Sequence, residues 1–290
     1  MKGRDLEPAE LIRLYGGRAR KRFGQNFLVN RSSLERIVDL AQLSEGERVV
    51  EVGPGPGALT STILRRDVPL TAIEIDRDLA EHLRETFGDD PCFTLIEGDA
   101  RKVDFGELFE GEAVKVIANL PYNVATPLLL QMIDQKTPPE RLVLMFQKEV
   151  ADRICAPVGS RASGWLTVAI SARFIARIGL RLPPGAFVPP PKIDSAVIVL
   201  TQRETPLCSL EDEAALRAIA ELGFGQRRKT LRNNLKGVLS AEEIEAAGVD
   251  PQHRAEVLSM EQWLLLVRAL DAETRQQMLE DSRSGDRVIK

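Results

Sequence analysis

Cysteine and histidine are scarce in this chain of 290 residues. Its three cysteines, Cys92, Cys155 and Cys208, are far apart and odd in number, which argues against a disulfide framework or a zinc site. We expect them to be buried thiols in a reducing compartment. The two histidines, His82 and His253, provide little material for a histidine-based metal centre or a Ser-His-Asp triad. We therefore expect no metal, and we place both histidines on the surface.

Long apolar stretches are also missing. No run approaches the roughly 20 residues that are needed to cross a bilayer. Residues 1–7 lack the apolar core of a signal peptide, and their acidic residues argue against a transit peptide. These absences predict a soluble, cytoplasmic protein with no membrane partner, and we expect a monomer.

Positive charge is concentrated in two places, although the formal net charge of the chain is −4. Residues 18–31 and 226–236 each contain five basic residues and no acidic one. They are Arg18, Arg20, Lys21, Arg22 and Arg31 in the first segment, and Arg227, Arg228, Lys229, Arg232 and Lys236 in the second. Such clusters on an acidic protein predict contacts with a nucleic-acid backbone. Solvated helix faces are the alternative.

Alternating strand and helix patterns follow residue 46. Strands are predicted at residues 48–52, 70–74, 93–96, 114–118 and 142–146, and helices at 58–65, 77–86 and 127–135. This alternation predicts an α/β fold with a parallel sheet and helices on both faces. Residues 167–173 and 195–201 are predicted to add edge strands.

The strand pattern ends near Leu207. Helices are then predicted at residues 210–222, 227–239, 241–247 and 260–270. We therefore predict four parts in the chain: an N-terminal extension at 1–20, an α/β domain at 21–204, a helical RNA-binding domain at 205–275, and a disordered tail at 276–290.

The four residues Asn119-Leu120-Pro121-Tyr122 close an apolar run that is typical of a buried parallel strand. The carboxyl ends of such strands face the crevice where open α/β sheets bind ligands. The Asn side chain and a backbone carbonyl held by the proline can accept hydrogen bonds from an exocyclic amine, and the Tyr ring can stack on a base. The motif favours a site for an amine-bearing base, and an ordinary turn is the alternative.

A glycine-rich turn, residues 53–57 (GPGPG), connects the first predicted strand to its helix. Together with Glu74 at the end of the next strand, it is compatible with a dinucleotide-binding motif, so a nicotinamide-dependent dehydrogenase is a competitor. Three features disfavour that function. Glu51 places a carboxylate beside the turn, two prolines remove N–H donors that a phosphate needs, and Asp99 adds an acid at the end of the third strand.

S-adenosylmethionine fits this acidic setting better, because it has no phosphate and carries a sulfonium and an ammonium group. In this interpretation Glu74 binds the ribose hydroxyls, and Asp99 accepts a hydrogen bond from the adenine amine. Gly53 and the rest of the turn pack against the methionine portion.

These motifs give the chain a close resemblance to the small-subunit ribosomal RNA adenine dimethyltransferase family, from Lys21 to about residue 268. The segments that carry it are 21–28 (KRFGQNFL), 52–57 (VGPGPG), 74–76 (EID), 97–100 (EGDA), 119–122 (NLPY), 145–151 (MFQKEVA), 187–196 (FVPPPKIDSA) and 224–235 (FGQRRKTLRNNL). The resemblance implies a Rossmann-like class I S-adenosylmethionine-dependent methyltransferase with a small all-helical C-terminal domain. It also implies N6,N6-dimethylation of two adjacent adenosines in the 3′-terminal hairpin loop of small-subunit rRNA, within an assembling ribosomal subunit.

The resemblance further implies roles for individual residues. The cofactor would be bound by Asn26, Leu28, Gly53, Gly55, Glu74, Asp99, Ala100 and Asn119. The target adenine would be held by Asn119, Leu120, Pro121 and Tyr122, with Phe187 stacking on its other face. The RNA would be bound by Arg20, Lys21, Arg22, Arg227, Arg228, Lys229 and Arg232. Pro56 is the main departure from the family pattern, at a position where members vary, and we expect binding to survive it.

Two rival functions stay open at this point. A large-subunit rRNA adenine methyltransferase of the antibiotic-resistance type shares the fold and much of the motif set, although segment 224–235 and the proline-rich loop favour the small-subunit enzyme. A ribosome-assembly or nucleic-acid-binding factor without catalysis could keep the same fold. The presence of Glu74, Asp99, Asn119 and Tyr122 argues against a purely binding role.

Overall fold

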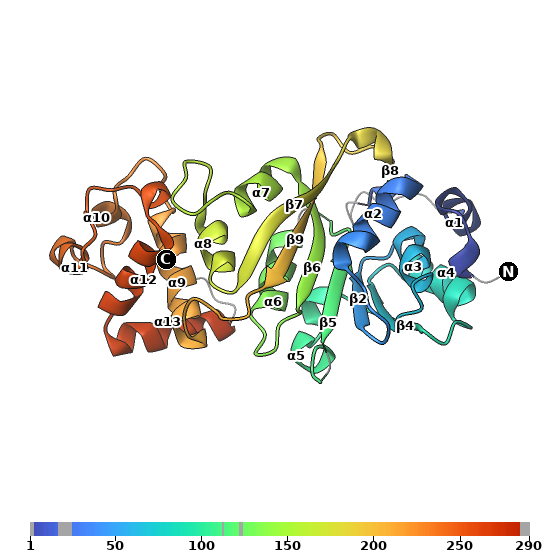
Figure 1. Ribbon diagram of the computed structural model, residues 1–290, viewed down its shortest axis with the longest axis horizontal. Coiled ribbons are helices and arrows are strands. Elements are labelled where there is room, and N and C mark those ends of the chain that lie inside the picture. Colours follow the sequence, from blue (N-terminus) through green and yellow to red (C-terminus); the bar gives the residue numbers. More distant parts are fainter. Residues whose placement is uncertain (1–2, 17–24, 112, 122–123, 285–290) are drawn as a thin grey trace. The chain divides into compact units, whose positions relative to one another are not determined.

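The computed structural model describes residues 3–16, 25–111, 113–121 and 124–284, and it divides into two compact units. Unit 1 comprises Met1–Ala151 and Arg177–Gln202, and unit 2 comprises Asp152–Ala176 and Arg203–Lys290. Unit 1 contains a seven-stranded sheet, and unit 2 is largely helical (Figure 1).

The strands are β1 (Phe27–Leu28), β2 (Arg48–Val52), β3 (Leu70–Glu74), β4 (Phe93–Glu97), β5 (Val114–Ala118), β6 (Arg141–Gln147), β7 (Phe174–Leu182), β8 (Phe187–Val188) and β9 (Ser195–Gln202). The α-helices are α1 (Pro8–Tyr15), α2 (Arg31–Ala41), α3 (Ala58–Leu64), α4 (Arg77–Phe87), α5 (Phe105–Leu108), α6 (Ala125–Ile133), α7 (Lys148–Ile154), α8 (Trp165–Ser171), α9 (Leu210–Gly223), α10 (Leu231–Asn234), α11 (Ala241–Ala246), α12 (Met260–Ala269) and α13 (Ala272–Ser284). Short 3-10 turns include η1 (Gly3–Asp5), η3 (Ala100–Lys102), η4 (Pro184–Ala186) and η5 (Ala255–Val257).

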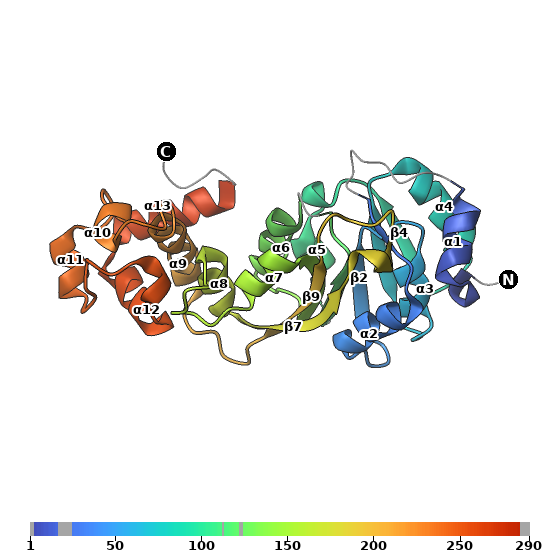
Figure 2. The same cartoon turned by 90° about the horizontal axis from the view of Figure 1, so that it is seen from above.

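The seven strands lie in the order β4-β3-β2-β5-β6-β9-β7, and the five from β4 to β6 are parallel. Strand β9 pairs antiparallel with β6. Because β2 lies between β3 and β5, the chain order reverses there, and the carboxyl ends of β2 and β5 flank the crevice where such sheets bind ligands. Helix α2 lies on one side of the sheet and α6 on the other (Figure 2). The predicted α/β fold with a parallel sheet is confirmed.

The two predicted edge strands are corrected by the structure. Residues 167–173 do not form a strand, since most of this stretch belongs to helix α8. A short apolar run has no periodicity that separates a buried helix from a buried strand. Residues 195–201 do form a strand, β9, but it is internal, because β7 lies outside it. Strand β7 is missing from the prediction because Ile175 and Gly179 occupy positions where polar side chains would show the alternation of apolar and polar residues.

Unit 2 differs from the prediction in three respects. The helix expected at residues 227–239 is only the short α10, because the N–H groups of Leu231 and Arg232 donate to the carbonyls of His253 and Pro251. Residues 152–176, expected in the α/β domain, belong to unit 2. Helix α13 extends to Ser284, where a disordered tail was expected, and it buries Met278 in the core of the unit.

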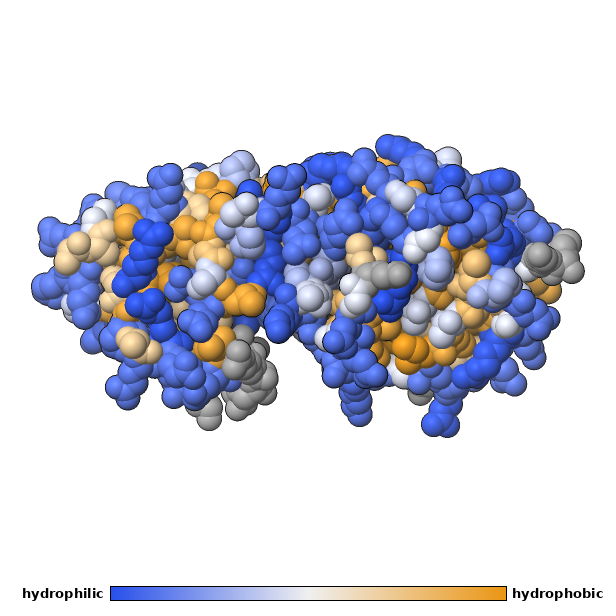
Figure 3. Space-filling model, turned by 60° about the horizontal axis from the view of Figure 1, so that its bottom comes forward, coloured by the Kyte–Doolittle hydropathy of each residue, from blue (hydrophilic) through white to orange (hydrophobic). Residues whose placement is uncertain are grey.

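The surface in Figure 3 is mostly hydrophilic, with apolar side chains in scattered patches. Within the described residues, no helix is long and apolar enough to cross a membrane. The three cysteines are free but only partly buried. His82, expected on the surface, is buried.

Candidate cofactor and substrate site

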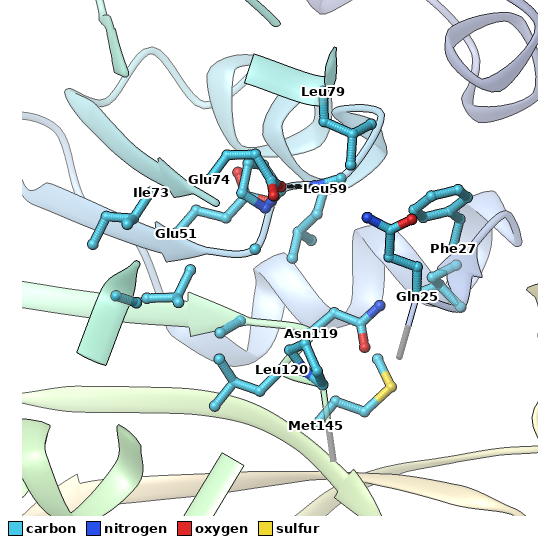
Figure 4. A pocket seen from close by; sticks show the side chains of 18 of the residues that line it. Gln25, Phe27, Glu51, Leu59, Ile73, Glu74, Leu79, Asn119, Leu120 and Met145 are labelled. Atoms are coloured by element: carbon cyan, nitrogen blue, oxygen red, sulfur yellow. Dashed lines mark hydrogen bonds between the residues drawn. The ribbon is translucent and has the colours of Figure 1, made fainter. Parts of the chain in front are cut away.

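A cavity of about 300 Å³ lies in unit 1 at the carboxyl ends of β2, β3 and β5. This volume is at the lower end of the range that binds small organic ligands. Ten of the predicted residues line it: Asn26, Leu28, Gly53, Gly55, Glu74, Asp99, Ala100, Asn119, Leu120 and Pro121. Figure 4 shows Glu51 and Glu74 on one side, and Asn119, Leu120 and Met145 on the other.

The glycine turn between β2 and α3 forms part of the wall. Its three glycines, Gly53, Gly55 and Gly57, all have positive φ. A Cβ atom on Gly57 would lie 2.5 Å from the ring of Phe87, so this position admits no side chain. The turn can therefore approach a ligand closely and still pack against helix α4.

The same turn has no backbone donor left for a phosphate. The N–H groups of Gly53, Gly55 and Gly57 donate to the Ile73 carbonyl at 2.9 Å, the Glu74 carboxylate at 3.1 Å and the Pro54 carbonyl at 3.1 Å. The two prolines between them have no N–H group. A pyrophosphate needs such donors, so this geometry argues against a dinucleotide site.

Glu74 ends β3, and its carboxylate is buried against the turn. It accepts hydrogen bonds from the N–H groups of Gly55 at 3.1 Å and Asp76 at 2.9 Å. Burial raises the pKa of Glu74 to about 7, although these two bonds oppose the rise. The group thus changes charge near neutral pH.

Glu51 is a second buried carboxyl group in the cavity wall. The hydroxyl of Thr60 donates to it at 2.7 Å. Burial, reinforced by the neighbouring charge of Glu74, raises the pKa of Glu51 to about 8. Near neutral pH Glu51 is therefore mostly neutral, and the part-ionised Glu74 carries the negative charge of this wall. Such a wall fits a ligand with positive charge and hydroxyl donors better than a phosphate. The residues present therefore fit S-adenosylmethionine.

Asn119 follows β5 and has its side-chain amide held in one orientation. Its Nδ2 donates to the backbone carbonyl of Asn26 at 3.2 Å, so Oδ1 is turned away from that contact. The carbonyl of Pro121 accepts from the Val124 N–H at 3.0 Å and keeps one lone pair. Asn119 and Pro121 both line the cavity, and the binding of an amine by these two oxygens stays a prediction. Tyr122 lies outside the described residues.

Asp99 lies in the cavity wall, but its carboxylate already has a partner. The Arg101 side chain donates from Nε and Nη2, with a shortest distance of 2.6 Å. These bonds hold the pKa of Asp99 below its usual value. If Asp99 accepts from an adenine amine, Arg101 has to share or release it. Arg101 comes directly after the EGDA motif that contains Asp99, but the spacing of the residues did not predict this ion pair.

Phe187, predicted to stack on the target adenine, is buried away from the cavity. It is 2% exposed, it packs in the core of unit 1, and it does not line the cavity. Strand β8 places it opposite Leu28 of β1, and it is Leu28 that reaches the cavity. In this arrangement the ring of Phe187 is covered, and its role in stacking on the target adenine stays a prediction.

Only some of the predicted RNA-binding residues lie in the part of the chain that the structure describes. In unit 2, Arg227, Arg228, Lys229 and Arg232 are all exposed, and Arg227 also contacts Glu256 at 3.3 Å. Arg20, Lys21 and Arg22 lie outside the described residues.

Several lining residues were not identified from the sequence. Gln25 donates to Asp76 at 3.1 Å, which ties the segment before β1 to the end of β3. Ile75 is 43% exposed and offers an apolar surface directly after Glu74. Met145 comes from β6, across the sheet. Only the position of Ile75, next to a predicted acid, could have signalled a role.

Known proteins resemble this chain over most of its length. The sequence pattern of the family described as "Ribosomal RNA adenine dimethylase" matches residues 16–272. "Ribosomal RNA small subunit methyltransferase A" of Pseudomonas aeruginosa is 43% identical over 258 residues, or 89% of this chain and 96% of the relative. The protein of that name from Magnetococcus marinus is 43% identical over 260 residues, or 88% of this chain and 93% of the relative.

Two solved structures share the fold. The 23S rRNA methyltransferase ErmE superimposes with a TM-score of 0.68 at 27% identity, covering 85% of this chain and 100% of that one. A dimethyladenosine transferase from Plasmodium falciparum gives a TM-score of 0.69 at 23% identity, covering 90% and 98%. At that identity the second likeness shows the fold alone, which is that of class I methyltransferases.

Proposed function

This chain belongs to the ribosomal RNA adenine dimethylase family, and we propose on that premise that it dimethylates the N6 amines of two adjacent adenosines in small-subunit rRNA. As a member of the family it is an rRNA adenine dimethyltransferase, with S-adenosylmethionine as the methyl donor. We place the target in the 3′-terminal hairpin loop, within an assembling subunit, and the protein in the cytoplasm as a monomer.

One observation carries the assignment of the site. The buried carboxylate of Glu74 and the oriented amide of Asn119 line one cavity at the reversal point of the sheet, beside a glycine turn with no free glycine N–H. A cofactor with ribose hydroxyls and positive charge fits the side of the cavity that Glu74 forms. An amine-bearing base fits the side that Asn119 forms.

Each of these residues has a task in binding the cofactor. The ionised carboxylate of Glu74 accepts from the ribose hydroxyls, and Gly53 and Gly55 let the chain pass close to the methionine portion. The charge of Glu74 favours the positive charges of the ligand, and Glu51 adds to it where it ionises, near pH 8. When bound, S-adenosylmethionine supplies an electrophilic methyl group. Asp99 would hold the adenine amine, and Arg101, which donates to the same carboxylate, would then have to share or release it.

The target adenine is held by hydrogen-bond acceptors. Asn119 Oδ1 and the Pro121 carbonyl accept from the two N–H groups of its amine, which favours a tetrahedral nitrogen with its lone pair free to react. Positioning and electrostatics supply most of the acceleration, and no general base is needed before transfer, because the methylated nitrogen is strongly acidic. Tyr122 stacks on the base, which at about 1–3 kcal/mol repays part of the cost of unstacking.

The basic residues of unit 2, together with Arg20, Lys21 and Arg22, bind the phosphate backbone of the rRNA. Each neutralised phosphate releases counterions, so the affinity for RNA falls steeply as salt rises. A hairpin loop suits this enzyme, because its bases are already partly unstacked.

A large-subunit target is the second candidate, and the likeness to ErmE favours it at 27% identity. The relatives at 43% identity that are named for the small subunit favour the first. Labelled methyl transfer to separated, unmethylated subunits, followed by mass analysis of the nucleosides, decides between them. Dimethyladenosine in the small subunit alone is expected. Label in the large subunit alone contradicts the proposal, and cofactor binding without transfer to either subunit favours a non-catalytic assembly factor.

A further inference from the structure

Helix α1 and the turn η1 precede the family match, which begins at residue 16, yet they pack firmly on unit 1. Leu6 and Leu11 are buried in the same core as α2 and α3. Gly3 leaves no room for a side chain, because a Cβ there would lie 2.3 Å from the Thr86 carbonyl. The segment is therefore part of the folded unit.

Arg4 anchors this segment. Its guanidinium donates to both carboxylate oxygens of Asp90, at 2.8 and 2.7 Å, and it also pairs with Asp67. The hydroxyl of Ser61 donates to the Arg4 carbonyl at 3.1 Å, and Arg65 donates to the same carbonyl at 3.0 Å. Helix α3, the residues just after it, and Asp90 after α4 thus hold η1, and α1 lies next to α3 and α4 in Figures 1 and 2.

From this anchor, α1 extends to the cavity. Ile12 is one of its lining residues. The ring of Tyr15 lies edge-on to Phe27, another lining residue, with 6.5 Å between ring centres, and 5.7 Å from the ring of His82. His82 Nε2 is 3.2 Å from the Pro56 carbonyl, inside the glycine turn. One helix thus touches the wall directly and supports two further parts of it.

We propose that α1 is a wall of the cofactor site, and that Ile12 on this helix slows dissociation of the adenosine ligand. This inference rests on the proposed function, since it takes the cavity to be the cofactor site. An apolar side chain that covers bound ligand adds contact area and closes a path for water. The affinity contributed in this way is expressed mainly in the dissociation rate.

Leu14 provides a matched control. It lies on the same helix, it is 58% exposed, and it does not line the cavity. Ile12→Ser and Leu14→Ser remove similar apolar volume from the same helix, so both variants show how much such a loss destabilises the helix. Only Ile12→Ser changes the wall of the cavity. Thermal unfolding of both variants shows whether each is folded.

The measurement is binding of S-adenosylhomocysteine to the full chain, by calorimetry and by stopped-flow dissociation. Ile12→Ser should weaken binding roughly 15- to 60-fold, mainly through faster release, as expected for the loss of two or three buried methyl or methylene groups. Leu14→Ser should match the unchanged protein within about twofold. Arg4→Gln, which loosens the anchor away from the cavity, should also speed release.

The outcomes separate the two proposals. If the unchanged protein binds and Ile12→Ser behaves like Leu14→Ser, the role of α1 is refuted while the cofactor site stands. If the unchanged protein does not bind S-adenosylhomocysteine, the proposed function and the role of α1 are both overturned.

Discussion

Replacement of Glu74 by glutamine tests the charge of the cofactor wall. Burial raises the pKa of Glu74 to about 7, so the ionised fraction falls from about nine-tenths at pH 8 to about one-tenth at pH 6. If only the carboxylate holds the ribose hydroxyls, the dissociation constant of S-adenosylhomocysteine rises about tenfold from pH 8 to pH 6. Near pH 7, binding should release about half a proton.

The substitution itself removes a charge-assisted hydrogen bond, worth about 1.5–3 kcal/mol. At pH 8, Glu74→Gln should therefore weaken binding by about 10- to 150-fold. The substitution should also make the affinity for S-adenosylhomocysteine less dependent on pH between 6 and 8. Calorimetry in buffers of different ionisation enthalpy measures both the affinity and the proton release.

Glu97 is the matched control for this substitution. It stands opposite Glu74 in the register of β3 and β4, it does not line the cavity, and it pairs with Arg84. Glu97→Gln should leave the affinity and its pH dependence unchanged. Equal losses in the two variants, or an affinity of the unchanged protein that is flat from pH 6 to pH 8, would refute the reasoning.

Three other substitutions test the remaining parts of the site. Asn119→Ala should lower methyl transfer at least about 100-fold and change the cofactor affinity much less, because its oxygen serves the transition state; equal losses in turnover and affinity would count against this division. Glu51→Gln should gain stability over the unchanged protein as pH rises from about 4.5 to 8. Burial raises the pKa of Glu51 to about 8 in the fold against 4.5 in the unfolded chain, so the stability present at low pH is lost between these two pH values, where the unfolded chain ionises and the buried group is still protonated. Urea unfolding at pH 5 and pH 8.5 should show a difference on the order of a few kcal/mol, and parallel pH curves would exclude it. Lys229→Gln should make the plot of log affinity for rRNA against log salt less steep by about 1, whereas the exposed Lys136→Gln should not; identical slopes would remove Lys229 from the RNA contact.

The parallel part of the sheet and the edge at which it binds ligands could be predicted, because the strands there are short and apolar and are bounded by turn residues. Glu74 and Asn119 end such strands, and the carboxyl ends of parallel strands meet at one edge of a sheet. Their proximity therefore follows from topology alone. The same reasoning fails for β7, because Gly179 and the exposed Ile175 interrupt the alternation of apolar and polar residues.

The contacts that the prediction missed depend on packing rather than on pattern. Phe187 lies in a motif with aromatic character, but only the pairing of β8 with β1 decides that its ring enters the core. Arg101 covers Asp99 because a short turn brings the two side chains together. The contact of Ile12 with the cavity depends on Arg4 holding the segment against α3 and α4. None of these has a signature in residue spacing.

A crystal structure of the protein with S-adenosylhomocysteine tests the central claim most directly. We expect the ligand in the cavity of unit 1, with its ribose hydroxyls within hydrogen-bond distance of Glu74, its amino-acid portion along Gly53 and Gly55, and its adenine beside Asp99. Asn119 Oδ1 should remain open toward the methyl position. A ligand bound elsewhere, or one in the cavity that leaves Glu74 without a ribose contact, would contradict the account.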